Sequence, residues 1–324
     1  MAYQPTILNG ETVFRNEVFQ TGLMSQLLDG IYDGEMTIGE LLSHGNFGVG
    51  TFNGLDGEMV VLDGVCYQVR HDGSVSLPDL RQQTPYAVVT NFVPMIKREL
   101  PLNLLRKSAS QILDDFTVSK NYMYAIKIYG EFEWVRTRTV IKQEKPYPKM
   151  VAATENEDIV QFDNVTGTIV GFRTPIYEQG ISVPGCHAHF IDDERVQGGH
   201  VVDFKLRSAK VEICPGTGLQ LHLPLTPEFS SATSLPRTWL SRSPRLKSTK
   251  FLSHRDTATG YITEGAALYC SVEGGSFVFI RAVKGAYASG TNSPWPRSRR
   301  AARTFSAAAS SSSAVASFFA LAGS

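Results

Sequence analysis

Three histidines bracket a short polar segment, and this pattern constrains the fold of that part of the chain. They are His187, His189 and His200, in the stretch GCHAHFIDDERVQGGH. On a strand, His187 and His189 leave the same face, because side chains alternate between the two faces. Residues 192–199 are typical of a polar turn that ends in glycine, and strand-like alternation resumes at His200. We therefore expect an antiparallel hairpin that returns His200 beside His189.

Three imidazoles that converge from two strands are typical of a divalent metal site with an open coordination position. Such sites are of the catalytic kind, and zinc is the usual occupant. An HxH pair alone would favour a solvated hairpin, because single histidines are mostly ordinary core or surface residues. The third histidine, His200 after the turn, favours the metal site.

The composition predicts a large globular body with a tail of different character. The chain has 324 residues, 42% of them hydrophobic, so it can bury a sizeable core and hold two domains. Its net charge is zero, but 4 acidic and 12 basic residues lie from Leu223 onward, against 27 and 19 before it. This asymmetry predicts an acidic body and a basic tail. The overall charge indicates neither nucleic acid nor a membrane as a partner.

The cysteines and the two ends of the chain bear on its location. Cys66, Cys186, Cys214 and Cys270 form no CxxC motif, so neither a thiolate zinc knuckle nor a dithiol redox motif is supported. The first residues lack the basic and apolar regions of a secretory signal peptide. The apolar run over 314–323 is about half the length that spans a bilayer. We expect a soluble, cytoplasmic protein with reduced cysteines.

The first 120 residues mix helix and strand signals. Thr37 and Glu40 form a capping box, which predicts a short helix that ends at Gly45. Apolar residues at helical spacing predict a longer helix over 102–116. Strands are predicted over 48–69 and 87–93.

Beyond residue 120 the hydrophobic period changes to two, and only strands are predicted. They cover 122–129, 132–140, 159–162, 168–172, the histidine hairpin and 211–223. The fold class is therefore α+β: a mixed N-terminal part whose sheet continues into a C-terminal antiparallel, barrel-like part that carries the metal site. We expect a catalytic body over 1–228, with two sub-domains that meet near 120–150. The remainder, 229–324, is a basic, low-complexity tail that we expect to be partly disordered.

Two charged residues could belong to a site. Glu58 opens the apolar run Met59–Leu62, so it is either a solvated residue at a strand end or a buried acid aimed at a site. Arg138 lies on the alternating strand 135–140, where it is either a surface cation or a clamp for a substrate carboxylate. The residue pattern alone leaves both alternatives open.

Other catalytic patterns are missing or weak. The kinase and P-loop glycine patterns and GxSxG are absent, so phosphoryl transfer and triad hydrolysis lack their sequence signals. Glu194 follows His189 by five residues, as in the HxH-x4-E run of cupin metal sites, although it falls in the predicted turn. A cupin-like, metal-dependent oxygenase is therefore an alternative.

Three long stretches of the chain resemble the α-acetolactate decarboxylase family. They are 30–58, 137–148 and 167–204, and the resemblance covers about residues 20–228. It implies a carboxy-lyase of the butanediol pathway that converts 2-acetolactate (2-hydroxy-2-methyl-3-oxobutanoate) to acetoin and CO2. The resemblance further implies a homodimer that requires zinc and no organic cofactor.

The resemblance also assigns roles to individual residues. The family's three zinc ligands fall on His187, His189 and His200, its active-site carboxylate on Glu58 and its active-site arginine on Arg138. A threonine at the family's substrate pocket falls on Thr51. In this assignment zinc stabilises the charge left by CO2, the arginine holds the substrate carboxylate, and the glutamate transfers the proton that completes acetoin.

The tail departs from the family pattern. In the family the tail brings a further glutamate to the active site, which by spacing would lie near Leu246. No Asp or Glu occurs between Glu228 and Asp256. Either Glu228 or Glu264 takes its place, or activity is reduced, or the tail is an unrelated extension. An inactive, metal-binding relative is therefore a second alternative.

Overall fold

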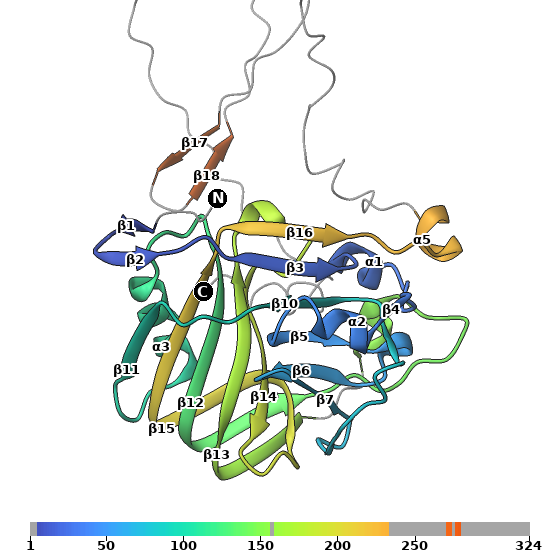
Figure 1. The fold of residues 1–324 in the computed structure, drawn as a ribbon, viewed down its shortest axis with the longest axis horizontal. Helices are drawn as coiled ribbons and strands as arrows, with labels where there is room; N and C mark the ends of the chain where they lie inside the picture. Colours follow the sequence, from blue (N-terminus) through green and yellow to red (C-terminus); the bar gives the residue numbers. More distant parts are fainter. Residues whose placement is uncertain (1–4, 156–158, 233–269, 274–275, 280–324) are drawn as a thin grey trace, which may run out of the picture. The chain divides into compact units, whose positions relative to one another are not determined.

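The computed structural model describes residues 5–155, 159–232, 270–273 and 276–279. The chain divides into two compact units, and residues 243–310 form the second of them. In this second unit the described part is a hairpin of β17 (Cys270–Glu273) and β18 (Ser276–Phe279). All other described elements belong to the first unit (Figure 1).

The first sheet has seven strands in the order β16-β3-β10-β5-β6-β7-β8. Neighbouring strands pair antiparallel, except that β16 pairs parallel with β3. The strand of this sheet that comes last in the sequence, β16, therefore lies at its edge, beside the strand that comes first, β3. The strands are β3 (Glu17–Thr21), β5 (Phe47–Thr51), β6 (Glu58–Leu62), β7 (Val65–Val69), β8 (Val75–Ser76), β10 (Ala87–Thr90) and β16 (Gly218–His222).

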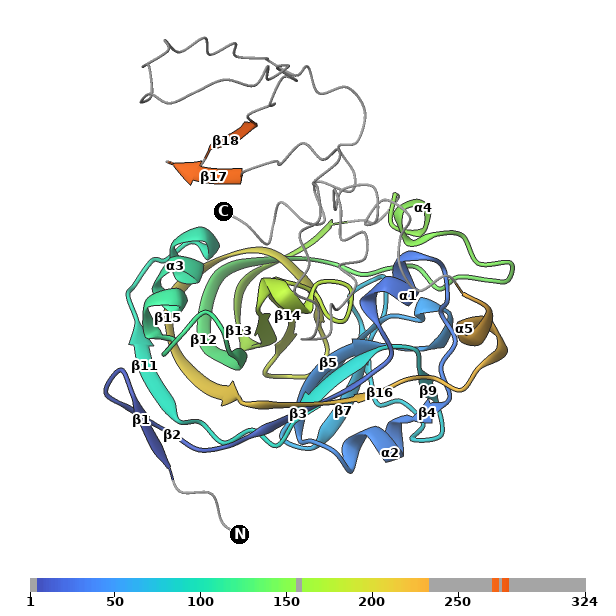
Figure 2. The ribbon, with the colours of Figure 1, turned by 90° about the horizontal axis from the view of Figure 1, so that it is seen from above.

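The second sheet is antiparallel and strongly curled. Its order is β11-β15-β12-β13-β14, and β14 pairs with β15 as well as with β13. Figure 2 shows its long strands curving around a common axis. In Figure 1 they run up the view, whereas those of the first sheet run across it. The strands are β11 (Ile96–Leu100), β12 (Met123–Arg138), β13 (Ile159–Thr174), β14 (Gly185–Asp192) and β15 (Gly198–Gly216).

The helices and remaining strands are short. Only α3 exceeds five residues among the described helices. The helices are α1 (Met24–Leu28), α2 (Ile38–Leu42), α3 (Arg106–Phe116), α4 (Met150–Ala153) and α5 (Pro227–Ser231), with 3-10 turns η1 (Asn53–Leu55) and η2 (Ile176–Glu178). Two small sheets pair β1 (Thr6–Leu8) with β2 (Glu11–Val13) and β4 (Met36–Thr37) with β9 (Gln83–Thr84).

Three buried apolar clusters hold the first unit together. One fills the concave side of the second sheet and includes Ala109 and Leu113 of α3 together with strand residues such as Phe190. Another lies between the two sheets, and a third lies between the first sheet and α2. The central strands of the first sheet are thus buried on both faces. This explains why they are continuous apolar runs rather than alternating ones.

The predicted α+β class and the antiparallel C-terminal half are confirmed. The capping box is present, because Thr37 Oγ1 accepts from the Glu40 amide at 3.2 Å and Glu40 Oε2 accepts from the Thr37 amide at 2.9 Å. The helix α2 ends at Leu42, before Gly45. The predicted helix over 102–116 starts only at Arg106, because Leu102 and Leu105 are exposed and add nothing to its buried face.

The strand bounds predicted from the sequence were wrong for the long strands. The predicted strands 122–129 and 132–140 are the single strand β12, whose pairing with β15 shifts register around Phe132 without a turn. Likewise 159–162 and 168–172 are both part of β13. The predicted strand 211–223 is two strands, because β15 ends at Gly216 and the chain then crosses to the first sheet. A register shift interrupts the alternation of side chains while the chain stays extended, so hydrophobic patterning alone reads it as the end of a strand.

We expect Phe132→Ala to lower the free energy of unfolding by about 3–5 kcal/mol. Phe132 is buried in the curled sheet and meets Phe190 and Phe204 edge-on, with ring centroids 5.4 Å and 6.0 Å apart. Urea denaturation of the purified variant measures the loss. Phe14→Ala is the control, since this ring is exposed and its removal should cost less than about 1 kcal/mol. Equal losses in the two variants would contradict the assignment of this core.

Candidate active site

The register of the second sheet brings four predicted site residues onto one face. His189 lies directly opposite His200 across β14 and β15, and Arg138 lies opposite His200 across β12 and β15. Directly paired residues point to the same side of a sheet. His187 shares this side, because it is two residues before His189 on β14. The predicted hairpin that returns His200 beside His189 is therefore present.

This face of the second sheet points toward the first sheet. His187 pairs with Phe172 and His189 with Val170 across β13 and β14. Phe172 and Val170 both pack in the apolar cluster between the two sheets. The histidines therefore project into the space between the sheets, where side chains from β5 and β6 can meet them.

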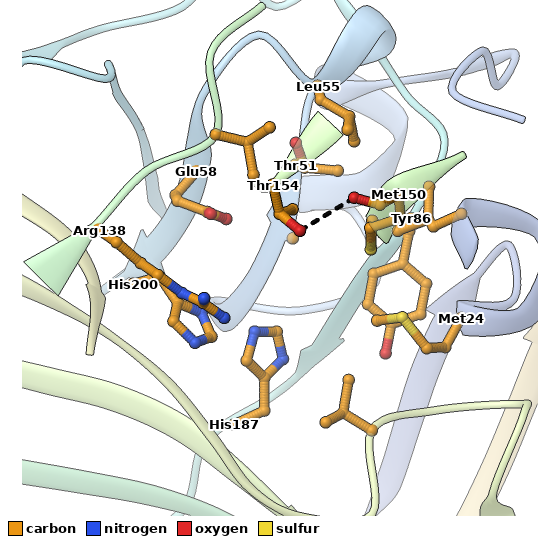
Figure 3. Close-up of a pocket in the computed structure, with 14 residues that line it drawn as sticks. Met24, Thr51, Leu55, Glu58, Tyr86, Arg138, Met150, Thr154, His187 and His200 are labelled. Carbon is orange, nitrogen blue, oxygen red and sulfur yellow. Dashed lines mark hydrogen bonds between the residues drawn. The ribbon is translucent and has the colours of Figure 1, made fainter. Parts of the chain in front are cut away.

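Thr51 and Glu58 reach the same space from the first sheet. They are directly paired across β5 and β6, so their side chains share a face. A cavity of about 60 Å³ is lined by Thr51, Glu58, Arg138, His187 and His200 among other residues. In Figure 3, Glu58, Arg138, His187 and His200 lie on one side of it. His189 is fully buried and does not line the cavity.

The three histidines form a compact cluster. One ring nitrogen of each lies within 4.8 Å of those of the other two, and the ring centroids are 5.0, 5.0 and 5.5 Å apart. Within the described part of the chain, no other group of three or more His, Cys, Asp or Glu residues has this geometry. The described cysteines Cys66, Cys186 and Cys214 are free thiols elsewhere in the first unit.

A hydrogen bond fixes the tautomer of His189. Its Nδ1 lies 2.8 Å from the carbonyl oxygen of Met59 on β6, and a carbonyl can only accept, so Nδ1 carries the proton. The buried Nε2 then holds a lone pair, and no described residue makes a hydrogen bond to it. It lies 3.3 Å from Glu58 Oε2. Two electron-rich atoms at this separation fit a cation bound between or beside them.

Burial keeps all three imidazoles neutral. It lowers the pKa of His187 to about 3 and that of His189 to about 4, and it lowers the pKa of His200 well below its ordinary range. For His187 and His200, the neighbouring imidazoles and the Arg138 guanidinium lower the pKa further. Neutral imidazoles offer lone pairs to a metal at neutral pH. Three such donors beside an open cavity fit a divalent metal with free coordination positions.

Glu58 and Arg138 both belong to this site by position. Glu58 is the first residue of β6, and its side chain lies beside His189 and is only 13% exposed. It is therefore not a solvated residue at a strand end. Arg138 is the last residue of β12 and lines the cavity, so it is not on an outer surface. Thr51 Oγ1 donates to the carbonyl oxygen of Gly57 at 2.8 Å, which links the ends of the turn before Glu58.

Comparison with known proteins identifies the family. The sequence model described as Alpha-acetolactate decarboxylase matches residues 18–234. The chain belongs to this family. The alpha-acetolactate decarboxylase of Bacillus subtilis is 42% identical over 217 residues, which are 67% of this chain and 85% of that protein. That of Klebsiella aerogenes is 40% identical and covers 68% of this chain and 84% of its own length.

A solved structure agrees with this assignment. The crystal structure of alpha-acetolactate decarboxylase from Bacillus subtilis strain 168 superimposes with a TM-score of 0.67 at 40% identity. It covers 69% of this chain and 96% of the solved chain. The family assignment removes the ground for a cupin-like oxygenase. Glu194, the carboxylate that this alternative required, is exposed in the turn between β14 and β15.

The rest of the cavity lining, on the side away from the histidines, was not identified from the sequence. It is largely apolar, and Figure 3 shows Met24, Tyr86 and Met150 on this side. Its residues come from short helices and connections, which have no hydrophobic period to detect. The Tyr86 hydroxyl lies 3.0 Å from Ser182 Oγ. Besides Gly50, the remaining lining residues, which we call the apolar wall, are Met24, Leu27, Leu55, Tyr86, Val140, Met150, Thr154 and Val183.

The sequence offered two acids, Glu228 and Glu264, in place of the family's tail glutamate, and the structure describes only Glu228. Glu228 lies on α5, 3.9 Å from Lys145 Nζ, and it is not among the residues that line the cavity. Glu264 and the region of Leu246 lie outside the described residues, as does most of the predicted tail. Among the helices that the structure describes, none is long and apolar enough to cross a membrane.

We expect Glu178→Gln to change how stability depends on pH. Glu178, in η2 near the cavity wall, is only 5% exposed, and burial raises its pKa from 4.5 to about 7. Between these values the folded protein holds a proton that the unfolded chain releases. The wild-type contribution to stability is therefore present below pH 4.5 and is lost as pH rises to about 7.

Urea denaturation at several pH values from 5 to 8 tests this expectation. The glutamine cannot titrate, so the variant should lose less stability than the wild type as the pH rises. Glu194→Gln, at an exposed position, is the control and should follow the wild type. Parallel pH curves for Glu178→Gln and wild type would show that this carboxyl does not titrate in the window.

Proposed function

We propose that this chain catalyses the zinc-dependent decarboxylation of 2-acetolactate to acetoin and CO2. The observation that carries the proposal is a cluster of three neutral histidines beside a cavity lined by Glu58 and Arg138, in a member of the acetolactate decarboxylase family. Each of these residue types matches one requirement of the reaction. The requirements are a ligand set for a Lewis acid, a clamp for a carboxylate, and a group that transfers a proton.

His187, His189 and His200 would hold the metal. The neutral nitrogen donors suit zinc, and the Met59 carbonyl orients the His189 ring for it. When bound, zinc supplies a Lewis acid beside the oxygens that gain negative charge as CO2 leaves.

Arg138 would bind the carboxylate of the substrate. Its guanidinium is a planar fork that matches a carboxylate with two parallel hydrogen bonds. Its backbone position opposite His200 puts this fork beside the histidine cluster. Holding the carboxylate fixes the direction of the bond that breaks, and orientation of this kind lowers the barrier before any chemistry occurs.

Glu58 would transfer the proton that completes acetoin. Loss of CO2 leaves an electron pair that delocalises into the adjacent ketone as an enediolate, and one carbon must then be protonated. Glu58 Oε2 lies 3.3 Å from His189 Nε2, so it would border the place where this charge develops. A carboxyl group there can give the proton and recover it from water. No organic cofactor is needed, because the substrate ketone accepts the electron pair.

The apolar wall would accommodate the two methyl groups of the substrate. Its leucine, valine and methionine side chains offer little hydrogen bonding to water. Exclusion of water strengthens the interactions of the charged groups on the opposite side. Thr51 would complete the pocket and hold the turn that precedes Glu58.

We propose the larger organisation on the same basis. Residues 1–228 would form the catalytic body, with the curled second sheet as its barrel-like support for the metal site. The family resemblance supports a homodimer that acts on a small-molecule substrate, without nucleic acid or a membrane as a partner. A cytoplasmic location stays a prediction from the sequence.

We expect His189→Ala to abolish acetoin formation and to lower bound metal well below one ion per chain. Two imidazoles cannot hold zinc against water and buffer as three can. Acetoin formed from racemic acetolactate, with and without a chelator, measures activity, and atomic absorption measures metal. His71→Ala, an exposed histidine far along the chain from the triad, should match the wild type. Full metal content in His189→Ala would place the metal elsewhere.

The same assay decides the alternative of an inactive relative. A wild-type protein that binds one zinc ion but forms no acetoin would contradict the proposed activity. In that case the absence of an acid between Glu228 and Asp256 would be the first difference to examine.

We expect Arg138→Lys to lower kcat/KM by one to two orders of magnitude, about 1.5–3 kcal/mol. Lysine keeps the positive charge but loses the two parallel hydrogen bonds of the guanidinium. Steady-state kinetics on the zinc-loaded protein measure the effect. Arg136→Lys is the matched control, because Arg136 is exposed on the same strand and hydrogen-bonds Gln161. An unchanged kcat/KM in Arg138→Lys would exclude Arg138 from carboxylate binding.

A further inference from the structure

The turn before Glu58 has a strained backbone. Leu55 has φ of 53° and Gly57 has φ of 93°, both in the left-handed region. A left-handed conformation costs a residue such as leucine about 1–2 kcal/mol. Gly57 also lies against β7, where an added Cβ would come within 2.3 Å of the Val69 carbonyl oxygen. Such a turn keeps its shape only where its surroundings hold it.

Asp56, in the middle of this turn, makes the contacts that hold it. The residue is 9% exposed. Its Oδ1 pairs with the Arg70 guanidinium, and its Oδ2 lies 3.4 Å from Lys142 Nζ. Its backbone carbonyl accepts from Gln68 Nε2 at 2.6 Å, and Arg70 Nη2 donates to Gln68 Oε1 at 3.1 Å. We call the group of Asp56, Gln68, Arg70 and Lys142 the Asp56 clamp.

The clamp joins the segments that carry the two charged groups of the site. Glu58 follows Asp56 by two residues, and Lys142 follows Arg138 by four. The next residue, Gln143, donates its amide to the Gly54 carbonyl at 2.7 Å, which adds a backbone link between the same two segments. Asp56 therefore lies where the turn that leads to Glu58 meets the connection that leaves Arg138.

The charges of the Asp56 clamp explain why its contacts can hold the strained turn. A buried carboxylate is costly unless cations and hydrogen bonds compensate it. The Asp56 carboxylate pairs with two cations, Arg70 and Lys142. Arg70 also donates a hydrogen bond to Gln68 of β7. Releasing one partner leaves the others imperfectly paired, so the turn would relax as a whole rather than lose one contact.

From these contacts we infer that Asp56 is a positioning residue: the Asp56 clamp sets the placement of Glu58 relative to His189 and Arg138. Asp56 does not line the cavity, so it acts through Glu58 and not on the substrate. The inference rests on the proposed function for its kinetic consequence. Its structural consequence, the position of the Glu58 carboxylate, is independent of activity.

Asp56→Asn tests the inference, because asparagine keeps the size of the side chain and removes its charge. With full zinc content, we expect kcat per bound metal to fall by about 10- to 100-fold and KM to change by less than about 3-fold, because misplacement by about 1 Å can cost two orders of magnitude. Binding by Arg138 and the metal site remains. Asp56→Glu restores a carboxylate between the cations and should recover part of kcat.

Asp114→Asn is a matched control. Asp114 also lies between an arginine and a lysine, with Arg173 Nη1 at 2.9 Å and Lys120 Nζ at 3.6 Å, but it belongs to α3. Its replacement removes a similar pair of contacts and should lower stability by a similar amount. If the control lost as much kcat per bound metal as Asp56→Asn, the positioning role would be overturned in favour of a general effect of stability.

A second variant avoids a change at a buried position. Lys142 is mostly exposed, so Lys142→Met should fold, and its kcat should fall by about 3- to 10-fold. Combined with Asp56→Asn it should cause little further loss, since both changes open the same clamp. Lys120→Met is its control. Wild-type kcat in both Asp56→Asn and Lys142→Met, or fully additive losses, would overturn the inference.

Crystal structures of the zinc-loaded variants separate this inference from the proposed function. In Asp56→Asn the Glu58 carboxylate should move by about 1 Å or more from its position beside His189. In Asp114→Asn it should stay in place. An unmoved carboxylate in Asp56→Asn overturns the positioning role even if the enzyme is active. A moved carboxylate supports it even if the wild-type protein forms no acetoin.

Discussion

The structure of the site depends on one hydrogen bond between the two sheets. His189 Nδ1 on β14 donates to the Met59 carbonyl on β6, and this contact links the two sheets and decides which nitrogen keeps a lone pair for a metal. Glu58 is the residue before Met59, so the stretch of β6 that orients His189 also carries the carboxylate beside it. Packing of the interface and chemistry of the site are therefore not separate properties in this fold.

The neutrality of the histidine cluster has the same origin. The interface buries the imidazoles among apolar residues, and burial is the largest cause that lowers their pKa. A solvated cluster with the same spacing would bind protons near pH 6 and lose metal in mildly acidic solution. The apolar cluster between the sheets thus keeps the imidazole nitrogens unprotonated, and so able to bind a metal, even when none is present.

The sequence predicted the parts of the site that follow a strand period. The HxH spacing and the glycine-ended turn predict the hairpin, because two-residue periodicity carries through to three dimensions. The sequence pattern could not decide between the alternatives for Glu58 and Arg138, since burial depends on the opposite sheet. The apolar wall and the Asp56 clamp lie in short helices and turns, where contacts distant in sequence determine the structure.

The position of β16 has a consequence for how the protein is made. This strand comes after all the others of the body, yet it pairs parallel with β3, near the start of the chain. Parallel pairing between such distant segments gives a high contact order, which slows folding. During synthesis the edge of the first sheet stays open until residues 218–222 leave the ribosome, although all three histidines have already emerged. A nascent chain therefore carries the three clustered histidines before the edge of its first sheet is closed.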